Sequence, residues 1–133
     1  MNIIHCFADA LDGDDFAQVA RLLENDAVYD TGEGLLHGSA AIVESFRKNS
    51  EWGRANLDGL EFYHEIDDER SPMDIRLIDV ARHGGEEIVI DHTMHVRLSH
   101  RKLIEYLRLE YPPGEKERVS EFFRRAGLSK DRA

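Results

Sequence analysis

The spacing of hydrophobic residues changes along the chain from helical to strand-like. Up to about residue 53, apart from one short strand-like stretch, apolar positions recur three and four residues apart, the spacing of one helix face. From residue 57 they alternate more often with polar positions, as in strands. The stretch 115–126 returns to helical spacing. The pattern therefore predicts helices first, then a run of strands, then one more helix.

Three helices and one short strand are expected before residue 54. Short polar side chains stand where each helix should begin, and these can accept hydrogen bonds from free backbone N–H groups. The candidate N-cap residues are Asn2, Asp14 or Asp15, and Ser39. The short strand is expected at 27–31, followed by a turn through the Gly-Glu-Gly segment 32–34. The third helix is expected to fade near 49–53.

Four strands are predicted after residue 57, at 57–66, 73–83, 87–98 and 102–111. Hairpin connections such as Gly84-Gly85 imply antiparallel pairing. The predicted fold class is therefore α+β: a curved antiparallel sheet wrapped around the N-terminal helices as a cone, with an extra C-terminal helix. We expect one domain over 1–133, with 1–111 as its core and 112–133 as a helical extension.

Composition and charge limit the binding partners that the protein is expected to have and its expected cellular location. The chain has 133 residues and a formal net charge of -10, with no basic stripe, which argues against nucleic acid and anionic membranes as partners. No apolar run approaches the ~20 residues of a membrane helix. No signal-peptide pattern is present at the N-terminus, so we expect a cytoplasmic protein. The single cysteine, Cys6, is expected to be a buried structural thiol.

The order of elements resembles the nuclear transport factor 2-like superfamily, which includes ketosteroid isomerases, scytalone dehydratase and polyketide cyclases of the SnoaL type. The resemblance covers about residues 3–111 and implies a cone-shaped cavity, used for many chemistries, and frequent pairing of two chains. The segments that carry it are FADALDGDDFAQVARLL (7–23), DAVYD (26–30), HGSAAIVESF (37–46), MHVRL (94–98) and KLIEYLRLEY (102–111).

The residues of ketosteroid isomerase chemistry do not carry over. That chemistry uses an aspartate base and two acids that hold the oxyanion. The two acids would fall at Phe7 and Met94, neither of which has a proton to donate. The base would fall at Thr31, with Asp30 one position short and so facing the other way on a regular strand. The resemblance therefore supports the scaffold and not that isomerase activity.

Other polar residues could serve such a cavity. If Met94 faces inward, His92 does too, because side chains alternate along a strand. The candidate catalytic residues are His92 and Asp30, and the candidate ligand-binding residues are Tyr29, Thr31, Trp52, Met94 and Tyr106. Each catalytic candidate also has a purely structural alternative. His92 could be a core residue with one hydrogen bond, and Asp30 could be a carboxylate that accepts hydrogen bonds from the backbone of the turn after it. Which face of 102–111 is concave stays open.

No metal or cofactor is expected, since His92 and His95 point to opposite faces and no phosphate-binding loop is present. We expect a small apolar or mixed-polarity ligand. A homodimer is expected through the outer sheet face around His95, and the adjacent Phe122 and Phe123 need cover from the chain itself or from a second copy. Two functions stay open: a cofactor-free dehydratase, isomerase or cyclase, or a non-catalytic ligand-binding or dimeric accessory module.

Overall fold

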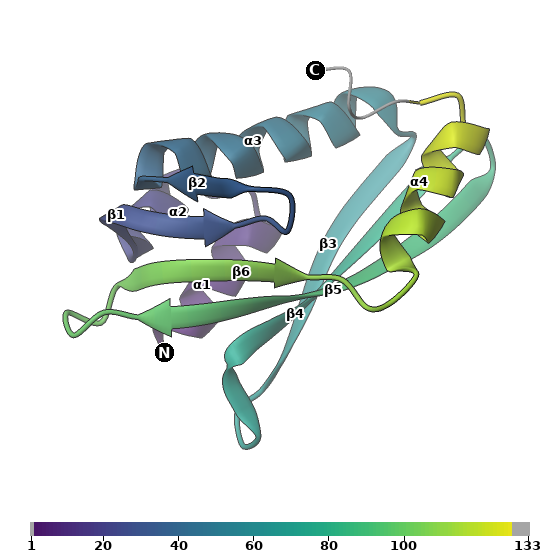
Figure 1. The fold of residues 1–133 in the computed structure, drawn as a ribbon. Coiled ribbons are helices and arrows are strands. Elements are labelled where there is room, and N and C mark those ends of the chain that lie inside the picture. The colour runs from purple at the N-terminus through teal and green to yellow at the C-terminus, as the bar shows by residue number, and fades with distance from the viewer. Residues whose placement is uncertain (1, 129–133) are drawn as a thin grey trace.

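The computed structural model describes residues 2–128 and has four helices and six strands among them (Figure 1). In chain order these elements are α1 Ile3–Asp12, α2 Phe16–Leu22, β1 Leu23–Asp30, β2 Leu35–His37, α3 Ser39–Asn56, β3 Gly59–Asp67, β4 Ser71–His83, β5 Glu86–Leu98, β6 Ile104–Glu110 and α4 Glu115–Arg125. No helix of this described part is long and apolar enough to cross a membrane.

The helix caps follow the sequence prediction at two of three positions. The Asn2 side chain accepts a hydrogen bond from the backbone N–H of His5, and Asp15 accepts one at the start of α2. Ser39 is instead the first residue of α3, so its prediction as N-cap is wrong. The reason is that the β1–β2 ladder continues through Gly38, whose N–H bonds the Ala27 carbonyl at 2.8 Å. Gly38 then turns the chain at φ 93°, a conformation that favours glycine.

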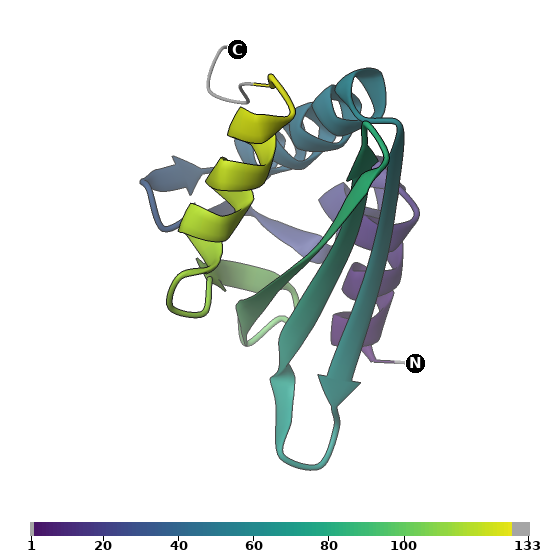
Figure 2. The same cartoon turned by 90° about the vertical axis from the view of Figure 1, so that its right-hand side faces the viewer.

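The six strands form one curved sheet in the order β2-β1-β6-β5-β4-β3. The predicted α+β cone is confirmed. All neighbouring strands are antiparallel except β1 and β6, which are parallel, so the sheet is mixed, a detail that the prediction of an antiparallel sheet did not include. Hairpin reasoning applies only to strands joined by short turns, whereas β1 and β6 are far apart in sequence. The unpredicted β2 is only three residues long. Figures 1 and 2 show the sheet curving around the N-terminal helices.

The main core lies between the helices and the concave face of the sheet. Its most buried large side chains are Phe7, Val19, Ile42, Ile75, Met94, Ile104 and Leu107. A second, smaller cluster joins α4 to the far half of β4 and β5, through Ala81, Ile88, Ile90 and Phe122. Cys6 is only half-buried, in contrast to the buried position that its helical pattern predicts, because the tightly packed face of α1 is formed by its neighbours Phe7 and Ala8.

Helix α4 packs where β6 stops. The β5–β6 ladder runs only from Thr93 to Leu98 on the β5 side. Beyond it, the Glu115 carboxylate accepts a hydrogen bond from the Asp91 N–H at 2.8 Å, and Arg118 donates one to the Val89 carbonyl. The first turn of α4 therefore satisfies backbone groups that a longer β6 would have paired.

The two adjacent phenylalanines of α4 are covered by the chain itself. Phe122 is 3% exposed in the second cluster, and the Phe123 ring meets the Trp52 ring edge-on with centroids 5.5 Å apart. The helix thus docks on its own sheet and on α3. Phe122 and Phe123 are therefore no evidence that a second chain packs on α4.

Candidate functional site

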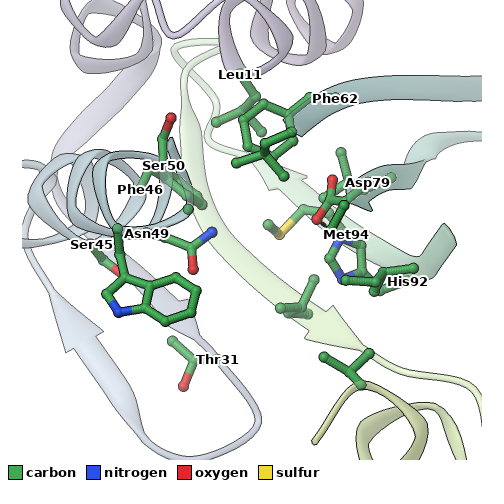
Figure 3. Close-up of a pocket in the computed structure, with 18 of the residues that line it drawn as sticks. Leu11, Thr31, Ser45, Phe46, Asn49, Ser50, Phe62, Asp79, His92 and Met94 are labelled. Carbon is green, nitrogen blue, oxygen red and sulfur yellow. Dashed lines mark ion pairs between the residues drawn. The ribbon is translucent and has the colours of Figure 1, made fainter. Parts of the chain in front are cut away.

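A cavity of about 440 Å³ lies between α3, the concave face of the sheet and α4 (Figure 3). Its volume falls within the range of small-molecule sites, roughly 300–1,000 Å³. Apolar side chains from the sheet and from α4 form much of its wall, among them Leu77, Ile90, Met94, Leu109 and Val119. The polar groups are few and come from separate elements, so their placement decides what the cavity can do.

One wall carries a carboxylate and an imidazole. On β5 the inward positions alternate, which brings His92 and Met94 to the cavity. The antiparallel register pairs Asp79 of β4 with Ile90, so Asp79 is a diagonal neighbour of His92 on the same face. The His92 Nε2 atom lies 3.5 Å from the Asp79 Oδ2 atom. The His92 side chain is 9% exposed and that of Asp79 is 18% exposed.

A phenol stands beside this pair. Tyr111 follows the last residue of β6, and its ring meets the His92 ring edge-on at 5.1 Å between centroids. Burial, together with the nearby carboxylates of Asp79, Glu33 and Glu115, raises the pKa of Tyr111 to about 12. The pKa of Tyr29 is also raised, chiefly by burial. Both phenols therefore keep their protons at neutral pH and can act as hydrogen-bond donors inside the cavity.

The opposite wall is built by α3. Ser45, Asn49 and Trp52 recur at helical spacing on α3 and line the cavity. Figure 3 shows Ser45 and Asn49 across the cavity from His92 and Asp79. Thr31, just after β1, lies on the same side of the cavity as Ser45 and Asn49 in this view. A ligand in the cavity would therefore meet hydroxyl and amide groups on one side and the acid–base pair on the other.

Two further carboxylates that line the cavity are held by protein partners. Asp14 Oδ2 accepts hydrogen bonds from Ser50 Oγ and Arg54 Nε, both at 2.9 Å. Asp12 Oδ2 lies 2.5 Å from the His64 Nδ1 atom. Burial raises the pKa of Asp12, and the bond with His64 partly offsets that rise. These contacts tie the end of α1 and the following loop to α3 and β3.

The sequence-based candidates divide into two groups in the structure. Five of them line the cavity, namely Tyr29, Thr31, Trp52, His92 and Met94. Asp30 and Tyr106 do not. The Asp30 Oδ1 atom accepts a hydrogen bond from the Gly32 N–H at 2.9 Å, as in the alternative in which it binds the following turn. Tyr106 lies beneath the Arg97 guanidinium at 4.8 Å, because Leu107 and Leu109 occupy the inward positions of β6.

Two residues of the site, Asp79 and Tyr111, were not among the sequence-based candidates. A signal for Asp79 exists: Arg76, Ile78, Val80 and Arg82 share the outer face of β4, so the alternate positions must face inward. Asp79 is then the one carboxylate between the apolar Leu77 and Ala81. A polar residue in an apolar inward series has to be partnered, and it marks a candidate site.

The outer face of the sheet is covered by ion pairs within the chain. His95 lies between two carboxylates, with Nδ1 2.8 Å from Asp74 and Nε2 2.7 Å from Glu110. Arg76 joins Asp91 to Glu65 across three strands. These charges satisfy one another without a second chain, and the homodimer stays a prediction. Among residues 2–128, no group of three or more potential metal ligands gathers at one point.

A curved sheet wrapped as a cone around helices, with a small-molecule-sized cavity inside, is the nuclear transport factor 2-like fold, and comparison with solved structures places the chain in that fold. No protein-family profile matches the sequence, and no curated protein matches it either. The similarity is therefore structural, at low sequence identity.

Three solved structures illustrate this similarity. A protein described as a SnoaL-like polyketide cyclase, from Shewanella denitrificans OS-217, has a TM-score of 0.65 and 11% identity over 90% of this chain and 95% of its own. An LEH-like epoxide hydrolase of Mycobacterium tuberculosis has a TM-score of 0.61 and 16% identity over 87% and 84%. RV0760c from M. tuberculosis, in complex with estradiol-17beta-hemisuccinate, has a TM-score of 0.59 and 16% identity over 85% and 93%.

Proposed function

We propose that this protein is a cofactor-free enzyme that transfers a proton on a small molecule bound in the cavity, as an isomerase or dehydratase does. The observation that carries the proposal is the Asp79–His92 pair, 3.5 Å apart on the cavity wall with the Tyr111 phenol beside it. A base, a group that tunes it and a proton donor are the elements of general acid–base catalysis.

Within the pair, Asp79 is the group placed to take the proton. The Nδ1 atom of His92 is fully buried, and its Nε2 atom faces the Asp79 carboxylate. Asp79 has twice the exposed fraction of His92, 18% against 9%. His92 then acts as a positioning residue, because its Nε2 atom faces the Asp79 carboxylate and holds it in place. This assignment differs from the sequence-based expectation, in which His92 itself is the base.

The proposed chemistry follows from these roles. The Asp79 carboxylate removes a proton from a carbon next to a carbonyl, and the electron pair of the broken C–H bond moves onto the carbonyl oxygen as an enolate. The Tyr111 phenol donates a hydrogen bond to that oxygen and remains protonated, since its pKa is raised to about 12. Return of the proton from Asp79 to another carbon completes an isomerisation. In a dehydration Asp79 instead gives this proton to the β-hydroxyl, which leaves as water while the enolate electrons re-form the carbonyl and a C=C bond.

The alternative is a non-catalytic binding protein. It is favoured by the two buried apolar side chains, Phe7 and Met94, at the positions where ketosteroid isomerase carries its oxyanion acids. The similarity to RV0760c supports small-molecule binding by a cavity of this fold, and it applies equally to both candidates. Only a measurement of turnover separates them.

The test is solvent-deuterium exchange. The protein is incubated in D₂O with a panel of β-hydroxy ketones and β,γ-unsaturated ketones, and loss of the signal from the proton next to the carbonyl is followed by ¹H NMR. For any compound that exchanges, Asp79→Asn should slow the exchange by roughly 10²–10⁴-fold, the usual contribution of a general base. Asp91→Asn is the matched control, because Asp91 is a carboxylate on the outer face of the sheet, paired with Arg76.

His92→Gln adds a readout of the positioning role. It should shift the pH dependence of the exchange rate, because the group that faces the Asp79 carboxylate changes, while ligand affinity stays similar. Exchange by Asp79→Asn at the wild-type rate would refute the assignment of the base. Binding of panel compounds with no exchange above the solvent background would favour the non-catalytic alternative.

A further inference from the structure

The α3 wall of the cavity carries two polar side chains for which the proposed reaction has no role. The lining residues with an amide or an aliphatic hydroxyl are Thr31, Ser45, Asn49 and Ser50. Ser50 donates a hydrogen bond to the Asp14 carboxylate at 2.9 Å, and Thr31 donates one to the Gly34 carbonyl at 3.2 Å. Within residues 2–128, the side chains of Ser45 and Asn49 have no such partner. Their polar groups are therefore available to a ligand.

Ser45 and Asn49 act on the same side of a ligand. They are four residues apart, so successive turns of α3 present them on one helix face. Ser45 is half-buried and Asn49 is exposed, so the cavity meets solvent beside Asn49. A hydroxyl and a primary amide can each donate and accept hydrogen bonds, and neither is charged. Together they can bind a neutral hydroxyl or a carbonyl oxygen.

These two side chains lie away from the reacting pair. Figure 3 shows Ser45 and Asn49 on one side of the cavity, His92 and Asp79 on the other, and Met94 between them in this view. The rest of the lining is largely apolar. A cavity of about 440 Å³ with this pattern fits a ligand that has an apolar body and a polar group at each end, because a few placed polar groups fix the orientation of a ligand in an apolar pocket.

From this arrangement we infer that Ser45 and Asn49 form a second binding point, which holds a neutral hydroxyl or carbonyl of the substrate at the end remote from the reacting ketone. The inference deepens the proposed function and rests on it, because Asp79 and Tyr111 define the reacting end. The substrate class is then an apolar ketone with a second polar group. A hydrogen bond at the remote end sets the orientation of the substrate and so places its C–H bond at the Asp79 carboxylate.

The test compares 4-(4-hydroxyphenyl)butan-2-one with 4-phenylbutan-2-one, two ketones that differ only in a hydroxyl group remote from the carbonyl. Affinity is measured by titration calorimetry and checked by the fluorescence of Trp52, the only tryptophan of the chain, which lines the cavity. The hydroxy ketone should bind roughly 3- to 10-fold more tightly, a modest gain because the ligand replaces water as the partner of Asn49. Equal affinities, no binding of either ketone, or tighter binding of the plain ketone would overturn the inference.

Two variants locate the second binding point. Asn49→Ala should remove most of the preference for the hydroxy ketone and leave the affinity for the plain ketone within about 2-fold. Ser45→Ala should lower the same preference. Damage to the fold would weaken both ketones alike, so the ratio of the two affinities separates a lost contact from a structural effect. Asn25→Ala is the matched control, because Asn25 is an exposed asparagine on β1 that does not line the cavity. A full preference in the double variant Ser45→Ala, Asn49→Ala would refute the site.

Failure here is distinguishable from failure of the proposed function. A cavity that prefers the hydroxy ketone through Asn49 but exchanges no ketone proton loses the enzyme proposal and keeps the second binding point. A cavity that exchanges ketone protons in an Asp79-dependent manner but binds the two ketones equally keeps the enzyme proposal and loses the second binding point. Circular dichroism of each variant shows whether the fold is retained.

Discussion

The substitution Phe122→Ala tests whether α4 is an integral part of the fold. Phe122 is 3% exposed and packs on Ala81, Ile88 and Ile90, so its removal opens a hole between α4 and the sheet. Because nearly the whole ring is buried, the loss combines the transfer free energy of the ring with a term for the cavity that is left.

The expected magnitude is at the lower end of the range for such truncations. Phe→Ala in a core costs about 3–5 kcal/mol, and a site that can collapse costs less. Helix α4 lies near the end of the described chain and can move toward the sheet, which favours about 3 kcal/mol. At a few degrees per kcal/mol for a domain of this size, the melting temperature should fall by roughly 10 °C.

The assay is urea unfolding followed by circular dichroism, at two protein concentrations. Val89→Ala is the control, because Val89 is 45% exposed and its truncation should change the free energy of unfolding by less than about 0.5 kcal/mol. A loss below about 1 kcal/mol for Phe122→Ala would refute the packing described here. A loss that grows on dilution would show that a second chain, and not the sheet, covers the ring.

Three further predictions concern single positions. Gly38→Ala should destabilise the protein by about 1–3 kcal/mol in urea unfolding, since φ 93° strains any other residue. Gly34→Ala is the control and should be nearly neutral, because an added Cβ would have no atom within 4 Å. Equal losses for the two variants would contradict the prediction. Asp15→Ala removes the N-cap of a seven-residue helix and should cost about 1 kcal/mol by the same measurement, and a wild-type midpoint would show that the cap does not contribute. The pKa of the Tyr111 phenol is raised to about 12 in the folded protein, so its contribution to stability is complete below about pH 10 and is lost as the pH rises to about 12. In Tyr111→Phe, the free energy of unfolding should therefore fall less steeply with pH in this range. An unchanged slope would contradict the prediction.

The sequence was informative wherever burial follows a local period. The alternation along β5 is regular enough that the residues alone put His92 and Met94 on one face, and the structure shows that this face lines the cavity. The same logic extends to Asp79, because the outer residues of β4 are unambiguous. Local signals thus suffice for one wall of the cavity and for the order of elements apart from the short β2.

The other wall depends on contacts that local patterns do not encode. Both faces of β6 carry large side chains, so its concave face is decided by the parallel pairing with β1, a partner far away in sequence, and by an irregularity in its pairing with β5. For that reason Tyr106 was a candidate while Tyr111, beyond the end of the strand, was not. The path of α4 over the cavity likewise depends on Glu115 and Arg118 meeting β5 through space.

The position of α4 has a consequence for the solution behaviour of the protein. Between Glu86 and His92, β5 has a neighbouring strand on one side only, so its other side is an edge to which a foreign strand could add. Glu115 and Arg118 occupy the backbone groups of that edge with charged side chains, and Phe122 covers the apolar residues beneath it. Helix α4 therefore blocks the pairing of this edge with a strand of another molecule. A variant truncated before α4 should self-associate through β5.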